Sequence, residues 1–275
     1  MKILVFDIGG TNIRYAVADG QTLGQYTLQP VSKNYRQTIS LIAGLARAHR
    51  PACIVGGVAG TFNTAHTKLV QSTHLPLWVG RPCVRDLERA GGAKVVLEND
   101  CALAALGEAV SGAGRGARIV GYIGFGTGIG GARIVDQRID ANAKGFEPGH
   151  HIIDWHVKKH RHPSPHPGDW ESFVSGTGIF FATGQKTEHI TSAKIWRQAE
   201  ERAAIGLINV AMFWSPDVII LGGSLMKKMS LTQINVSYRK RMRIFPQPPI
   251  LKRAKLGDFS GLYGAVALAK QGGRA

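Results

Sequence analysis

The sequence predicts an α/β protein whose two halves face a single ligand. Two apolar runs, 3–6 and 119–123, each lead into a glycine-rich turn that is followed by a second strand-like run. An apolar-periodic stretch at 39–48 adds a helix between strands, and this mixture of periods is typical of an α/β fold. With 275 residues, 44% of them hydrophobic, the chain can bury one large core or two moderate ones.

The first glycine-rich turn lies in the segment Asp-Ile-Gly-Gly-Thr-Asn-Ile-Arg at 7–14. Glycines adopt backbone angles closed to other residues, so main-chain N–H groups can approach an anion there, while an aspartate can hold a hydrated Mg²⁺. The candidate phosphate-binding residues are Asp7, Gly9, Gly10, Thr11 and Asn12. The alternative is an ordinary Gly-Gly hairpin turn, because a lone glycine motif is weak evidence.

The second glycine-rich turn, at 124–131, reads Gly-Phe-Gly-Thr-Gly-Ile-Gly-Gly. A short β-branched run follows it rather than a long helix, which argues against a dinucleotide fingerprint, and no Gly-Lys-Ser/Thr follows as in a Walker loop. Its candidate phosphate-binding residues are Gly126, Thr127 and Gly128. Two such hairpins, more than a hundred residues apart, predict two halves that bind one nucleotide.

The remaining elements follow in an α/β order. We expect strands at 2–6, 13–18, 52–55, 118–123, 132–135 and 218–221, and helices at 39–48, 101–110, 192–213 and 261–270. The strand at 218–221 ends in Gly222 and Gly223. Asp100 falls at the start of an alanine-rich helix, where free N–H groups favour a carboxylate. The glycine-rich joint at 112–117 marks the boundary between the halves.

Cysteine content and hydropathy predict a cytoplasmic protein without a membrane partner. Cys53, Cys83 and Cys101 are odd in number and lack paired spacing, so a disulfide framework is not expected. The apolar run after Lys2 is too short for a signal peptide, and no apolar run reaches the roughly 18 residues needed to span a bilayer.

Seven segments in order resemble the signature of the ROK family of sugar kinases and repressors. They are 7–14, 56–60, Glu98-Asn99-Asp100, 124–131, Glu147-Pro148-Gly149-His150, Trp170-Glu171 with Ser175-Gly176, and 219–224. The resemblance implies a two-lobed actin-like ATPase (ribonuclease H-like) fold with an interdomain active-site cleft. It implies a small N-terminal lobe, 1–116 plus a returning helix at about 258–275, and a large lobe, 117–257.

The same resemblance implies roles for individual residues. Asp100 would be the catalytic base, Mg²⁺ would lie near Asp7, and ATP would be the co-substrate. The implied sugar-binding residues are Gly60, Asn63, Asn99, Glu147, His150 and Glu171, and Gly222 and Gly223 would lie against the adenosine. An alternative reading makes Asn99-Asp100 a helix cap only.

The expected reaction is phosphoryl transfer from ATP to the 6-hydroxyl of a hexose, with glucose as the first choice. Mannose, fructose and the N-acetylhexosamines stay open, because the segment His74-Leu75-Pro76-Leu77-Trp78 departs from the family's Asn-Leu-Pro-Gly-Trp. The resemblance also implies a homodimer. A repressor is not expected, since Asp7 leaves no room before it for a helix-turn-helix domain.

A second departure lies between His150 and Glu171, where family members carry cysteines that hold a structural zinc. Here residues 160–169 contain histidines, prolines and no cysteine, and His162, Ser164 and Asp169 occupy the cysteine positions. Serine is a poor zinc ligand, so structural zinc is not expected. The only plausible ligands would be His150, His162, His166 and Asp169.

The charge balance is strongly basic, with 34 Lys and Arg against 18 Asp and Glu and a formal net charge of +16. Basic residues cluster at 158–162, 227–228, 239–243 and 252–255. The simpler interpretation of these clusters is a solvated basic surface. The more specific interpretation is a surface that binds polyphosphate as the phosphoryl donor. A non-catalytic sugar sensor or nucleic-acid-binding protein is the alternative from another class of function, although nucleic acid is not the expected partner.

Overall fold

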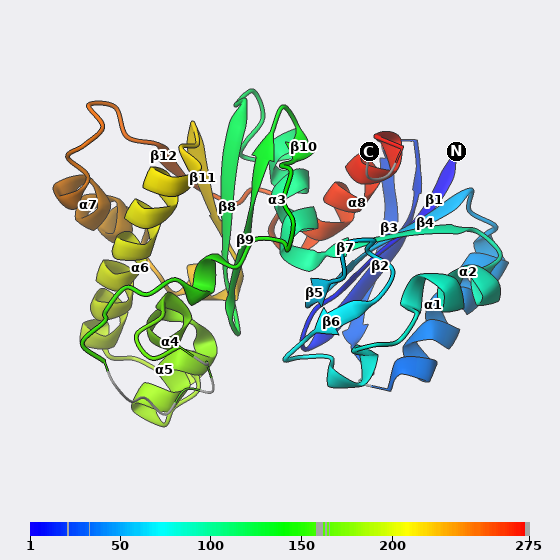
Figure 1. Ribbon diagram of the computed structural model, residues 1–275, viewed down its shortest axis with the longest axis horizontal. Helices are drawn as coiled ribbons and strands as arrows, with labels where there is room; N and C mark the ends of the chain where they lie inside the picture. Colours follow the sequence, from blue (N-terminus) through cyan, green and yellow to red (C-terminus); the bar gives the residue numbers. More distant parts are fainter. Residues whose placement is uncertain (21, 33, 158–161, 163, 165, 273–275) are drawn as a thin grey trace. The chain divides into compact units, whose positions relative to one another are not determined.

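The structure is a computed structural model that describes residues 1–20, 22–32, 34–157, 162, 164 and 166–272 (Figure 1). Contacts within the chain divide it into two compact units. Unit 1 comprises Met1–Gly112, Ala141–Gly145 and Asp258–Ala275, and unit 2 comprises Ala113–Asp140 and Phe146–Gly257. Most of the basic cluster at 158–162 lies outside the described residues, which include only His162 of it.

Unit 1 is built on a five-stranded sheet of order β3-β2-β1-β4-β7. The strands of unit 1 are β1 (Lys2–Ile8), β2 (Asn12–Asp19), β3 (Thr22–Pro30), β4 (Cys53–Val58), β5 (Thr61–Phe62), β6 (Leu69–Gln71) and β7 (Lys94–Asn99). β1 pairs antiparallel with β2 and parallel with β4, which in turn pairs parallel with β7. The short strands β5 and β6 form a separate hairpin.

Helices cover both faces of this sheet, as Figure 1 shows. They are α1 (Tyr35–His49), α2 (Cys83–Gly91), α3 (Asp100–Ser111) and α8 (Ser260–Lys270), with short 3₁₀ turns η1 (Pro76–Trp78) and η5 (Gly257–Phe259). α1 packs against α2, while α8 packs against α3, β1 and β4. Apolar side chains from β1 and α1, including Leu4, Phe6, Ile8 and Ile42, are buried in the core.

Unit 2 repeats the same sheet plan in the order β10-β9-β8-β11-β12. Its strands are β8 (Ile119–Phe125), β9 (Ile129–Val135), β10 (Arg138–Ile139), β11 (Val218–Gly222) and β12 (Ile250–Arg253). β8 pairs antiparallel with β9 and parallel with β11, as β1 does with β2 and β4. The two glycine-rich turns therefore occupy equivalent positions, each joining the central strand of a sheet to its antiparallel neighbour.

The helices of unit 2 contribute side chains to one hydrophobic core, which they share with β8 and β11. They are α4 (Trp170–Val174), α5 (Gly176–Thr183), α6 (Ala193–Trp214) and α7 (Leu231–Arg241), with 3₁₀ turns η2 (Pro148–His150), η3 (Thr187–His189) and η4 (Ser224–Lys227). Trp170 is fully buried, and its ring meets that of Phe125 edge to face at 5.3 Å between centroids. This contact attaches α4 to the end of β8, next to the second glycine-rich turn.

The structure confirms the predicted strand-turn-strand pattern at both glycine segments and the predicted helices. The prediction missed β3, because most of this edge strand is exposed and its side chains do not alternate between apolar and polar. No helix in the described part of the chain is long and apolar enough to cross a membrane.

Candidate functional site

The first glycine-rich turn of unit 1 is closed by main-chain hydrogen bonds. The Gly9 N–H donates to the carbonyl of Asn12 at 3.0 Å, and the Val31 N–H donates to the carbonyl of Thr11 at 3.0 Å. Asp7 precedes the turn within β1, flanked by the fully buried Phe6 and Ile8. Because successive side chains of a strand alternate between faces, Asp7 projects from the face opposite to these two.

The Asp7 carboxylate is buried but incompletely satisfied. Its side chain is only 14% exposed, and Oδ1 lacks a hydrogen-bond partner among the described residues. Oδ2 lies 3.6 Å from Arg14 Nη1. Burial, followed by the negative charge of Asp100, raises the pKa of Asp7 to about 7 despite the opposing charge of Arg14. A buried carboxylate oxygen without a partner suits a cation, so these residues fit the expected hydrated Mg²⁺.

Asn99 and Asp100 start α3 on the same side of the sheet as Asp7. Asn99 Oδ1 accepts from the Ala102 N–H at 3.0 Å, which caps the helix, and Asp100 Oδ1 accepts from the Cys101 N–H at 3.0 Å. A Cβ added to Gly57 would lie 3.2 Å from both Asp7 Oδ1 and Asp100 Cα. Glycine at position 57 therefore lets the two aspartates approach each other beside the turn.

Of the sugar-side residues predicted in unit 1, Gly60 and Asn63 flank β5 of the β5–β6 hairpin, and Asn99 ends β7. Asn99 Nδ2 donates to the Gly60 carbonyl at 3.1 Å, which joins this hairpin to α3. Asn63 Oδ1 accepts from the N–H groups of Thr67 at 2.9 Å and Lys68 at 3.1 Å. The Asn63 side chain thus stabilises its own loop, and its contact with a sugar stays a prediction.

In unit 2 the second glycine-rich turn rests on the start of α5. The Gly126 N–H donates to the Gly128 carbonyl at 2.9 Å, and the Gly176 N–H donates to the Gly126 carbonyl at 2.8 Å. The Thr177 N–H also donates to the Thr127 carbonyl at 3.1 Å. These hydrogen bonds hold the turn against the first residues of α5.

The glycine pair after β11 lies beside this turn. Gly222 stands opposite Gly124 in the parallel register of β11 and β8. Gly223 has φ 85°, a left-handed conformation that favours glycine, and a Cβ there would collide with the Phe125 carbonyl. The fold thus brings two of the predicted nucleotide-binding segments together within unit 2.

Glu171 lies directly against the second glycine-rich turn. Its Oε2 accepts from the Ile129 N–H at 2.7 Å, and a Cβ on Gly128 would run into the same carboxylate. Burial raises the pKa of Glu171, while the hydrogen bond from Ile129 and the nearby His150 oppose that effect.

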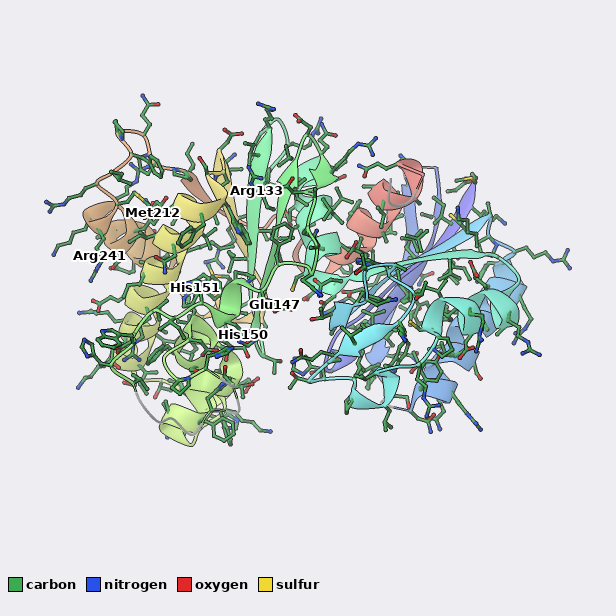
Figure 2. The ribbon with its side chains drawn as sticks, in the orientation of Figure 1. Arg133, Glu147, His150, His151, Met212 and Arg241 are labelled. Carbon is green, nitrogen blue, oxygen red and sulfur yellow. The ribbon has the colours of Figure 1, made fainter. Side chains whose placement is uncertain are left out.

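His150 lies close to Glu147 in Figure 2, and the charges of both predicted sugar-binding glutamates, Glu147 and Glu171, act on it. Its Nδ1 is 3.0 Å from Asp169 Oδ2 in a hydrogen bond. This hydrogen bond raises the pKa of His150, and burial opposes the effect. The negative charges of Glu171 and Glu147 raise the pKa further. Two carboxylates and an imidazole therefore gather in unit 2, as hydroxyl-rich ligands require.

Asp169 accepts hydrogen bonds from several side chains, including His150, and so holds the His150 ring in place. It is completely buried, and besides His150 it accepts hydrogen bonds from the Ser164 hydroxyl, the Ser172 hydroxyl and the Ser172 N–H. Burial by itself raises the pKa of Asp169, but the hydrogen bonds from its three partners outweigh it and hold the pKa well below its ordinary value. Among the described residues, no group of three or more His, Cys, Asp or Glu side chains is arranged to hold a metal ion.

Sequence reasoning missed the partners of these side chains. Arg14 bridges Asp7 to Asp258, which lies 244 residues later, with Nη2 3.4 Å from Asp258 Oδ1. Gly261 of α8 also lies against the Asp7 carboxyl group. Such long-range neighbours leave no local pattern. The hydrogen bond from the Ser172 N–H to Asp169 could have been found, because an aspartate just before a helix typically accepts from the third main-chain N–H of that helix.

Comparison with known proteins matches the chain to one family, to relatives of similar length and to a solved structure. The model of the ROK family matches residues 3–272. The chain is 27% identical to the N-acetyl-D-glucosamine kinase of Mannheimia succiniciproducens, covering 96% of this chain and 97% of that protein. It is 26% identical to the glucokinase of Streptomyces coelicolor, covering 96% of each. The structure matches a ROK family glucokinase from Streptomyces griseus in complex with glucose and AMPPNP, with a TM-score of 0.82, 25% identity, and coverage of 98% and 100%.

Proposed function

The chain belongs to the ROK family and has the two-lobed actin-like ATPase fold, and we propose that it is a hexokinase. In this proposal it transfers the terminal phosphoryl group of ATP to the 6-hydroxyl of a hexose. Relatives that match nearly the full length of the chain are named as sugar kinases, which supports this reaction class.

One observation carries the proposal: Asp7 and Asp100 approach each other beside a glycine-rich turn. Phosphoryl transfer to an alcohol needs a base near the hydroxyl, donors that position the phosphates and a cation that offsets their charge. We assign the base to Asp100, which receives the hydroxyl proton. Asn99 caps α3 and fixes the backbone that carries this base.

We assign Mg²⁺ binding, through water, to Asp7. When bound, the ion would offset the negative charge of the donor phosphates. The phosphates are assigned to the turn residues Gly9, Gly10, Thr11 and Asn12 in unit 1 and Gly126, Thr127 and Gly128 in unit 2. Gly222 and Gly223 are assigned to the adenosine, whose close approach is helped by the absence of side chains.

We assign the sugar to side chains held by the network around Asp169. Glu147, His150 and Glu171 supply acceptors and a donor for ring hydroxyls, and Asn99 with Gly60 and Asn63 supply polar groups in unit 1. Because Asp169 fixes the ring nitrogen Nδ1 of His150, the opposite nitrogen of the same ring is oriented for a ligand.

Glucose is the first choice of hexose, and an N-acetylhexosamine is the alternative. Among the relatives that match the chain at similar identity, some are named glucokinase and others N-acetyl-D-glucosamine kinase. Discrimination between them depends on whether the site leaves space at the sugar's 2-position. Activity on a panel of sugars therefore decides the substrate.

A polyphosphate donor is the second candidate, favoured by one feature of unit 2. Between Val218 and Gly257 the chain has no Asp or Glu and nine basic residues, all exposed. They are Lys227, Lys228, Arg239, Lys240, Arg241, Arg243, Lys252, Arg253 and Lys255. An excess of basic side chains of this kind attracts polyanions. Arg241 projects from the end of α7 in Figure 2.

The test is phosphoryl transfer by the purified protein to glucose, mannose, fructose and N-acetylhexosamines, with Mg-ATP and Mg-polyphosphate in parallel. We expect turnover of glucose with ATP, and loss of on the order of 10²- to 10⁴-fold in kcat for Asp100→Asn with sugar binding retained. Asp136→Asn, at an exposed site in unit 2, is the matched control. Sugar binding without turnover in the wild type would reject the kinase and favour a sugar sensor.

A further inference from the structure

His74 lies against the first glycine-rich turn. A Cβ added to Gly10 would lie 2.9 Å from His74 Cγ and 3.1 Å from Nδ1. The nearest atom to a Cβ on the adjacent Gly9 is the Asn12 carbonyl oxygen at 3.7 Å, an ordinary contact. Glycine is therefore needed at position 10 because the His74 ring packs on the backbone of the turn.

Hydrogen bonds hold the His74 loop to the end of β1. The Ala59 N–H donates to the Ile8 carbonyl at 2.9 Å, and the Ser72 hydroxyl donates to the Ala59 carbonyl at 2.6 Å. The Leu75 N–H then donates to the Ser72 hydroxyl at 3.0 Å. His74 lies between these two loop residues, so the loop backbone is fixed relative to the turn.

Apolar burial fixes the other side of the same loop. Leu75 and Trp78 are fully buried, and the Trp78 ring meets that of Tyr35 edge to face at 5.0 Å. His74 itself is only partly buried, unlike Leu75 and Trp78. Packing alone would be served by an apolar side chain such as its neighbour Leu75, whereas an imidazole keeps an N–H donor in either charge state.

We propose that His74 is a catalytic residue that donates a hydrogen bond to the phosphoryl group during its transfer. This inference rests on the proposed kinase function. The phosphoryl group gains its new bond to the sugar oxygen while its bond to the donor breaks, and in the transition state its charge is spread over three equatorial oxygens. A fixed donor beside the turn stabilises that charge without moving, which is how preorganised donors lower a barrier.

The test compares His74→Phe with His74→Gln. Phenylalanine keeps a flat ring against Gly10 but has no donor, while glutamine keeps a donor. We expect His74→Phe to lower kcat by on the order of 10²-fold, the usual effect of removing one such donor. Glutamine should recover a substantial part of that loss. His49→Phe, at an exposed position in the last turn of α1, is the matched control and should keep wild-type kcat.

Ligand binding separates catalysis from packing. For His74→Phe, glucose and AMPPNP should bind within about twofold of the wild type, whereas ADP with aluminium fluoride and glucose should bind far more weakly, because the donor acts in the transition state. Thermal melting checks that the variant is folded.

Two results would overturn the inference, and they can be told apart. A folded His74→Phe enzyme with kcat within about threefold of the wild type would show that the ring only packs on Gly10, while leaving the kinase assignment intact. A wild type without turnover for any sugar and donor would reject the kinase assignment and this role together.

Discussion

Two aspartates, the largely buried Asp7 in unit 1 and the fully buried Asp169 in unit 2, have pKa values that are shifted in opposite directions. The side chain of Asp7 is 14% exposed, and its pKa is raised to about 7. Asp169 is completely buried, yet its pKa is held below its ordinary value. Burial raises the pKa of both, so depth cannot explain the difference.

The difference comes from hydrogen-bond donors around Asp169 and from the negative charge of Asp100, which adds to burial in raising the pKa of Asp7. Four groups from three residues, the His150 ring nitrogen, the Ser164 hydroxyl, and the hydroxyl and N–H of Ser172, form hydrogen bonds to Asp169 and stabilise its charge. Asp7 has a weak ion pair with Arg14 and an oxygen without a partner in the described part of the chain. A satisfied carboxylate supports structure, whereas an unsatisfied one is suited to bind a cation that arrives with the substrate.

Among the variants that test this difference between Asp7 and Asp169, we expect Asp7→Asn to have the largest effect. Without the carboxylate, Mg²⁺ and the donor phosphates lose a charged contact, so kcat/KM should fall on the order of 10³-fold, or about 4 kcal/mol. Steady-state kinetics over a range of Mg²⁺ concentrations measure this loss. Activity within tenfold of the wild type would show that Asp7 does not serve the metal.

The same variant should be more stable than the wild type in metal-free buffer. A carboxyl group whose folded pKa is raised destabilises the folded protein progressively as pH rises from its unfolded pKa to its folded pKa. The advantage of Asp7→Asn should therefore grow between about pH 4 and pH 7 and stay constant above that, reaching at least roughly 1 kcal/mol. Melting temperatures measured with a chelator over this pH range test whether Asp7→Asn is the more stable protein. Asp136→Asn changes an exposed aspartate and should show no such trend.

Asp169→Asn should have the opposite effect on stability. Asparagine keeps the shape but replaces one acceptor oxygen with an NH₂ group, leaving His150 or a serine without its partner, so unfolding should become easier by about 3 kcal/mol. Sugar KM should rise more than kcat falls, because the change reaches the sugar through the orientation of His150. Urea unfolding and kinetics test both parts. An unchanged KM would separate Asp169 from the sugar site.

Sequence reasoning reached the fold because its main signals are local. The hairpin at Gly9 and Gly10 combines an apolar strand, a turn and a second strand within a few residues, and the order of motifs supplied the family. The environment of Asp7 could not be reached in this way, since Asp258 and Gly261 come from the far end of the chain. The contact between His74 and Gly10 also depends on tertiary packing across 64 positions.

A smaller effect is expected from Ser164→Ala. The Ser164 hydroxyl is one of several donors to Asp169, so its loss leaves the carboxylate largely satisfied and should cost about 1 kcal/mol. Ser192→Ala is the matched control, because Ser192 caps α6 without a side-chain hydrogen bond. Urea unfolding of both variants measures the difference. A loss as large as that of Asp169→Asn would show that the network depends on this one donor.

The smallest effect is expected from zinc. Asp169 Oδ2 already accepts from His150 and Ser164, so zinc would have to displace satisfied hydrogen bonds and accept a serine hydroxyl, a poor ligand, near its coordination sphere. Neither micromolar zinc nor a chelator should move the melting temperature by more than about 1 °C. Stabilisation by zinc that the chelator reverses, and that Asp169→Asn abolishes, would show that Asp169 belongs to a metal site. In that case both aspartates would hold a metal, Asp7 a magnesium ion and Asp169 a zinc ion, and Asp169 would not be explained by its hydrogen bonds alone.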